Sequence, residues 1–273
     1  MFKSVFAKEF TAVPWLETSA LMQSHPTGIV FSVEKPNVIV GPNGAGKSAL
    51  MRALSLATLS SLTGISALDD KYAGGLSEEP CWKKIEERWR EKYEFLGGLT
   101  METDNAPAMF YRPGHLPGNE RMVAAAMMTG YFEEAKEYGR LTRNKSSGQQ
   151  CSALLDRIVE VLKGAPASKQ YAMQNWSWNG GKPDNWAGDN VRYLKARFGT
   201  LPDTVVPVIL MDEPEQSLDA KAEAMLWRHI VGADTSKVQV IVATHSLSPI
   251  MHPDQYNLIE AIPGYANEVR ALL

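Results

Sequence analysis

The feature that most constrains this chain is the glycine-rich octapeptide Gly41–Ser48, which reads GPNGAGKS. It follows the apolar run Val38-Ile39-Val40 and precedes a stretch whose apolar residues recur at helical spacing. A strand that leads through such a loop into a helix gathers main-chain N–H groups and the positive end of the helix dipole at one point. The pattern therefore predicts an anion-binding loop, of the type that holds phosphate groups, within an α/β fold.

The rest of the chain extends the α/β prediction. Val205–Met211 and Val238–Ala243 are continuous apolar runs, typical of strands buried on both faces. Helices are expected from Ser147 or Gly148 to about Leu162, and over Ala220–Ile230. Shorter strands are expected over Gly28–Val33, before the loop, and over Met109–Arg112. Strands that alternate with helices predict a mainly parallel central sheet with helices on its faces.

The loop residues suit the binding of a nucleotide triphosphate. Glycines let the backbone curl closely around phosphates, Lys47 can reach the β- and γ-phosphates, and the Ser48 hydroxyl can bind Mg²⁺. The residues predicted to contact the nucleotide here are Asn43, Gly44, Ala45, Gly46, Lys47, Ser48 and Ala49.

Polar residues follow two predicted buried strands, at the edge where the loop also lies. Asp212 and Glu213 end the first of these strands, and His245 follows the second. We expect Asp212 to join Ser48 as a metal ligand and Glu213 to deprotonate an attacking water. His245 can hydrogen-bond to the terminal phosphate, so Lys47, Glu213 and His245 form the predicted catalytic set.

Five segments of the chain resemble, in the same order, the motifs of the ABC ATPase superfamily. They are Gly41–Ser48, Ser146-Ser147-Gly148-Gln149, Asp212-Glu213, Ser217-Leu218-Asp219 and His245. Asp212-Glu213-Pro214-Glu215 and Thr244–Ser248 are more similar to the compact SMC, RecF and OLD-type branch than to transporters. The resemblance implies a P-loop NTPase head with an antiparallel N-terminal β part and a helical subdomain. It also implies ATP and Mg²⁺ as ligands.

The same resemblance implies a head-to-tail homodimer that holds ATP between two copies. Ser146 and Gly148 would contact the nucleotide bound to the partner, and Asp219 would lie in the loop that couples the two sites. A polar residue before an amphipathic helix is also an ordinary helix cap.

The chain departs from the family pattern in two motifs. Lys145 stands where the signature usually has leucine, and no glutamine occurs between Gln23 and Gln149. The usual glutamine helps to hold Mg²⁺ and water, and Arg112 or His115 is the nearest substitute. Trp15 and Phe31 are both candidates for stacking on adenine, although the core is the favoured place for each.

We expect residues 1–273 to form a single ABC-type ATPase domain with two inserted segments. Residues 66–145 are predicted to form a helical or lid subdomain that includes the helices Trp82–Leu96 and Glu120–Arg140. Residues 165–203 form a Trp-rich insertion between the signature motif and the strand before Asp212. Its tryptophans and basic residues fit packing on the sheet, docking of a protein partner, or contact with single-stranded nucleic acid.

Composition indicates a cytoplasmic protein. The formal net charge is −3, so nothing pulls the whole chain toward nucleic acid or an anionic membrane. The chain has only two cysteines, Cys81 and Cys151, and we expect neither a signal peptide nor a membrane-spanning segment.

These features predict an ATP-hydrolysing, dimeric switch that controls a partner effector such as a nuclease. The branch resemblance suggests a role in DNA maintenance or antiviral defence, with nucleic acid as a further ligand. Two alternatives stay open: the ATPase subunit of a membrane transporter, and an ATP sensor that does not hydrolyse its ligand.

Overall fold

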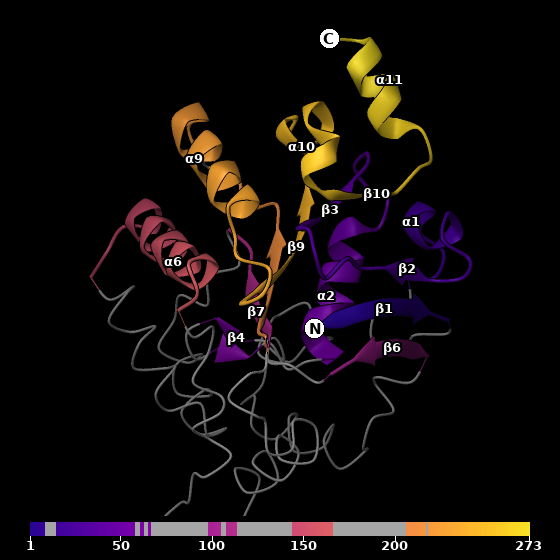
Figure 1. Cartoon of the computed structure of the whole chain (residues 1–273), viewed down its shortest axis with the longest axis horizontal. Coiled ribbons are helices and arrows are strands. Elements are labelled where there is room, and N and C mark those ends of the chain that lie inside the picture. The colour runs from indigo at the N-terminus through magenta and orange to yellow at the C-terminus, as the bar shows by residue number, and fades with distance from the viewer. Residues whose placement is uncertain are drawn as a thin grey trace, which may run out of the picture.

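The fold was analysed in a computed structural model of the chain (Figure 1). It describes residues 1–8, 15–57, 61–62, 65–66, 98–104, 108–113, 144–165, 206–216 and 218–273. The predicted helices Trp82–Leu96 and Glu120–Arg140 lie outside the described residues. So does the Trp-rich insertion 165–203, except for its first residue.

A five-stranded sheet forms the centre of the structure, with the strand order β10-β3-β9-β8-β7. Every neighbouring pair in this sheet is parallel. The strands are β3 (Asn37–Val40), β7 (Ala108–Tyr111), β8 (Val208–Asp212), β9 (Gln239–Thr244) and β10 (Asn257–Glu260). All residues of β3, β8 and β9 are buried, which confirms that their continuous apolar runs belong to inner strands of a parallel sheet.

Helices cover both sides of this sheet (Figure 1). Helix α2 (Lys47–Ala57) packs against β7, β8 and β9, whereas α6 (Ser147–Leu162) packs against α9 (Ala220–Val231) on the other side. Leu226, Trp227 and Ile230 form the buried stripe of α9. The predicted α/β architecture, with a parallel sheet between helices, is therefore confirmed.

A second, antiparallel sheet lies beside α2, with the order β2-β1-β6. Its strands are β1 (Phe2–Ala7), β2 (Ile29–Val30) and β6 (Leu99–Thr103). The side chain of Gln239 joins the two sheets, because its amide accepts from the N–H of Phe2 at 2.7 Å and donates to the carbonyl of Phe2 at 2.7 Å. The described part of 66–145 thus supplies strands to both sheets, since β6 lies in this sheet and β7 in the central one.

The prediction of a strand over Gly28–Val33 is wrong in its length. Only Ile29–Val30 forms a strand, and it pairs with β1. Beyond it the chain turns toward the central sheet, where the buried Asn37 side chain accepts from the N–H of Ser32 at 2.6 Å. The apolar residues Phe31 and Val33 extended the predicted strand through this crossing point.

Short elements complete the described structure. They are α1 (Ala20–Gln23), β4 (Ser61–Leu62), β5 (Ile65–Ser66), α10 (Ser248–Met251), the 3₁₀ helix η3 (Pro253–Gln255) and α11 (Tyr265–Ala271). Of the helices in the described part of the chain, none has the length and apolar character needed to cross a bilayer.

Candidate functional site

The glycine-rich loop connects β3 to α2 and packs tightly on the segment before α1. Gly46 has a φ of 103°, and a Cβ there would lie 2.4 Å from the Cβ of Ser19. The N–H of Leu21 donates to the carbonyl of Ala45 at 2.9 Å, which fastens the loop to α1. Only glycine satisfies both the left-handed backbone and this close approach at position 46.

Helix α2 begins at Lys47, so its first turn points its N-terminal end at the loop. The first N–H groups of any α-helix have no partner within the helix, and the helix dipole adds a positive field at the same end. Ser48 and Ala49 lie in this first turn. The loop and the turn together therefore form a place suited to an anion.

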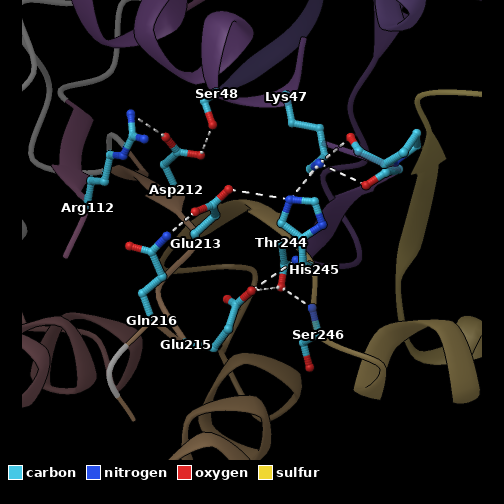
Figure 2. Close-up of polar contacts among 12 residues, drawn as sticks. Lys47, Ser48, Arg112, Asp212, Glu213, Glu215, Gln216, Thr244, His245 and Ser246 are labelled. Carbon is cyan, nitrogen blue, oxygen red and sulfur yellow. Dashed lines mark hydrogen bonds and ion pairs between the residues drawn. The ribbon is translucent and has the colours of Figure 1, made fainter. Parts of the chain in front are cut away.

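The Lys47 side chain is held inside the loop by main-chain carbonyl groups of the loop (Figure 2). Its ammonium donates to the carbonyl of Gly41 at 2.8 Å and to that of Pro42 at 3.0 Å. It also lies 3.1 Å from Nε2 of His245. The side chain is buried, and desolvation lowers the pKa of Lys47 below its ordinary value, although the nearby carboxylates of Glu213 and Asp212 oppose this shift.

Asp212 ends β8 and is only 1% exposed. Its Oδ1 accepts from the Ser48 hydroxyl at 2.9 Å, and its Oδ2 lies 3.2 Å from Nη1 of Arg112. Desolvation raises the pKa of Asp212 to about 6, against the opposing effects of Arg112 and Ser48. Asp212 and Ser48, which were predicted to share a metal ion, are thus in direct contact.

Glu213 follows Asp212 in a left-handed backbone conformation, with a φ of 49°. Non-glycine residues rarely adopt this conformation, and such residues concentrate at functional sites. The Glu213 carboxylate accepts from the amide of Gln216, and its Oε1 lies 3.4 Å from Nε2 of His245 (Figure 2). The backbone therefore directs this carboxylate toward the same nitrogen that Lys47 contacts.

The structure brings together Lys47, Ser48, Asp212, Glu213 and His245 at the carboxyl ends of β3, β8 and β9. Neighbouring parallel strands end at the same edge of a sheet, which is why residues so distant in sequence meet there.

Glu215 is a site residue that sequence reasoning left without a role. Its Oε1 accepts from the Thr244 hydroxyl at 2.7 Å and from the N–H of His245 at 2.9 Å. The Ser246 hydroxyl donates a hydrogen bond to Oε1 of Glu223 on α9, at 2.6 Å. The sequence signal that could have identified Glu215 is the acidic residue two positions after Glu213. In the sequence analysis this residue contributed only to the family resemblance.

Ser146 of the signature motif and Asp219 are helix caps in this structure. Ser146 caps α6 in a reciprocal pair with Gln149, and the Asp219 carboxylate caps α9 by accepting from the N–H of Ala222 at 2.8 Å. Within the described residues, the polar contacts seen for the Ser146 and Asp219 side chains are these caps, which lie within their own helices.

Of the candidates for the glutamine position and for adenine stacking, the structure describes three, which are Arg112, Phe31 and Trp15. Arg112 reaches the site through Asp212, whereas His115 lies outside the described residues. Phe31 is buried in the core against Phe2, with ring centroids 6.5 Å apart. Trp15 is 52% exposed and has the Arg52 guanidinium of α2 6.0 Å from its ring centroid, so its indole is accessible.

The donor atoms at Asp212 suit a hard divalent cation. Oδ2 of Asp212 is buried and has an ion pair with Arg112 but no hydrogen-bond donor, and the Ser48 oxygen is adjacent to Oδ1. Among the described residues, no group of three or more His, Cys, Asp or Glu could enclose a metal. A site with one carboxylate and one hydroxyl matches Mg²⁺, which takes most of its ligands from phosphates and water.

Together, the loop and the helix end can hold an anion, the Ser48–Asp212 pair can hold a divalent cation, and the Glu213–His245 pair can accept and relay a proton. These three functions lie within contact distance of one another. A scan against models of known protein families and a search of curated proteins both find no match to this chain.

Proposed function

We propose that the chain binds Mg-ATP and hydrolyses it as an ABC-type ATPase of the compact SMC, RecF and OLD-like branch. The observation that carries the proposal is the contact of Lys47, Ser48, Asp212, Glu213 and His245 around the loop 41–46. A P-loop NTPase needs these chemical groups at one point: a phosphate cradle, a metal carboxylate and a base.

The loop and Lys47 bind the β- and γ-phosphates. The ammonium now donates to the carbonyls of Gly41 and Pro42, and phosphate oxygens are stronger acceptors that replace those contacts. Ser48 and Asp212 hold Mg²⁺ with their oxygens. When bound, the metal neutralises charge that develops on the transferred phosphoryl group.

Glu213 is the general base that takes a proton from the attacking water. Its carboxylate is fixed on one side by the Gln216 amide and lies 3.4 Å from His245 on the other. His245 donates to the terminal phosphate and moves from its contact with Lys47 to do so. Glu215 fixes the main chain of His245 and is therefore a positioning residue.

ATP binding closes two copies of the chain into a dimer, and hydrolysis reopens it. Ser146 is exposed at the N-terminal end of α6, where the helix dipole favours a phosphate bound to the partner copy, and the exposed Asp219 lies in the loop that couples the two sites. In this proposal the switch acts on a protein effector such as a nuclease, in DNA maintenance or antiviral defence, and that role rests on the sequence resemblance alone.

The test is hydrolysis and dimerisation of the Glu213→Gln variant. The amide keeps the size of the side chain but cannot accept the proton, so we expect hydrolysis to fall by about a hundredfold or more. The variant still binds ATP and accumulates as a dimer, measured by light scattering during size-exclusion chromatography. Glu268→Gln, on the exposed surface of α11, is the matched control and should behave as wild type.

Two outcomes decide against the proposal. Hydrolysis at the wild-type rate by Glu213→Gln would remove Glu213 from the base role. Formation of no ADP by the wild-type chain in a single-turnover assay, with ATP still bound, would favour the sensor alternative.

A further inference from the structure

Arg112 meets Asp212 because of the register between β7 and β8. Tyr111 pairs with Met211 in this parallel ladder, so the next residue on each strand lies at the same carboxyl edge of the sheet. The guanidinium of Arg112 lies 3.2 Å from the Asp212 carboxylate, and the Arg112 side chain is 22% exposed. β7 is an edge strand of this sheet among the described residues, and Arg112 approaches the site from the side opposite Lys47 (Figure 2).

The chain's own groups engage both oxygens of Asp212. The Ser48 hydroxyl donates to Oδ1, and the Arg112 charge faces Oδ2. Ser48 and Asp212 are also the two protein ligands of Mg²⁺ in the proposed function. The positive charge of the guanidinium therefore competes with that of a divalent cation for the same carboxylate.

The contact between Arg112 and Asp212 is an ion pair without hydrogen-bond geometry. Oδ2 has no hydrogen-bond donor even though Nη1 is close to it. A pairing of this kind neutralises the buried charge without the directional bonds of a fork-like arginine–carboxylate pair. It is suited to a contact that forms and breaks in each cycle.

We propose that Arg112 is an internal counter-ion that takes the place of Mg²⁺ at Asp212 until a nucleoside triphosphate binds. The inference rests on the proposed function, because it uses the same metal ligands. A metal ion that enters alone displaces the guanidinium from the Asp212 carboxylate. A triphosphate supplies new anionic oxygens for Arg112, so metal and nucleotide bind with positive coupling.

The test measures Mn²⁺ binding to the nucleotide-free protein. Binding is quantified from the decrease in the electron paramagnetic resonance signal of free Mn²⁺. Arg112→Gln and Arg112→Met remove the competing charge, and Met also keeps the length of the apolar stem. Both variants should bind Mn²⁺ about tenfold or more tightly than wild type, as a like charge within a few ångströms changes ionic equilibria by one to three powers of ten. Arg112→Lys keeps a charge and should bind Mn²⁺ as weakly as wild type.

Equal Mn²⁺ affinity in wild type, Arg112→Gln and Arg112→Met would overturn the inference. Thermal melting of each variant shows that the comparison is made on folded protein.

A second measurement separates this failure from a failure of the proposed function. A fluorescent ATP analogue is titrated into wild type with Mg²⁺ present. Absence of binding would contradict the ATPase proposal itself. Binding of the analogue, together with unchanged Mn²⁺ affinity in the Arg112 variants, would contradict only the role of Arg112.

Discussion

Replacement of Asp212 by asparagine should stabilise the nucleotide-free protein at neutral pH while removing a ligand of the proposed metal site. Asp212 is 1% exposed, and its burial raises its pKa from 3.8 to about 6 despite the neighbouring Arg112 and Ser48. The folded protein therefore carries the cost of an ionised, buried carboxylate at neutral pH. Asparagine has nearly the same shape and no charge at any pH.

The pKa shift gives the size and the sign of the effect. A rise from 3.8 to about 6 is roughly two pKa units, which corresponds to about 3 kcal/mol. Because the folded-state pKa is the higher one, the folded state binds the proton more tightly than the unfolded state. The resulting stability is fully present below the unfolded pKa of 3.8 and is lost as the pH rises through about 6.

The assay is thermal unfolding of wild type and Asp212→Asn, without nucleotide and with a chelator, between about pH 4 and about pH 7.5. The two melting temperatures should be similar at the acidic end. At the neutral end the variant should melt higher, by up to roughly 6–12 °C for a chain of this size. Asp156→Asn, on the exposed face of α6, controls for the loss of an ordinary carboxylate. Parallel curves for wild type and Asp212→Asn across the pH range would refute the reasoning.

Two further substitutions test the loop and the backbone beside it. Lys47→Ala removes the ammonium that is expected to move to phosphate oxygens, and should weaken ATP binding by about a hundredfold, because a hydrogen bond to a charged group contributes up to roughly 3 kcal/mol. Calorimetry measures this against Lys221→Ala on the exposed side of α9, and equal affinity in the two variants would contradict the phosphate cradle. Glu213→Gly relieves the left-handed backbone at φ 49° and should be about 1 kcal/mol more stable than Glu213→Ala, while both lose hydrolysis. Chemical unfolding of the pair checks this, and an alanine variant as stable as the glycine variant would show that the backbone is unstrained.

Local signals in the sequence predicted the inner strands and the long helices well. Helices α6 and α9 begin and end within about one residue of their predicted limits, because helical periodicity and caps such as Ser146 and Asp219 act over a few residues. The apolar runs before Gly41 and Glu213 identified β3 and β8 for the same reason. Since the ends of parallel strands meet at one edge, the cluster of Lys47, Asp212 and His245 followed from the order of the elements.

Contacts between distant segments were beyond the reach of these local signals. The pairing of Arg112 with Asp212 depends on which strand neighbours β8 and in what register, and neither periodicity nor composition specifies that. The Gln239 bridge between the two sheets likewise joins positions more than two hundred residues apart. The left-handed conformation of Glu213 also carried no signal, because glutamate is not a residue that favours it.

The central claim is that a triphosphate lies in the loop 41–46 with its terminal group among Lys47, Asp212, Glu213 and His245. The most direct measurement is an experimental structure of the chain with Mg²⁺ and a slowly hydrolysed ATP analogue. The account predicts phosphates against the N-terminal end of α2, the metal between Ser48 and Asp212, and the terminal phosphate in contact with Lys47. An analogue bound elsewhere, with Lys47 still donating to the carbonyls of Gly41 and Pro42, would contradict it.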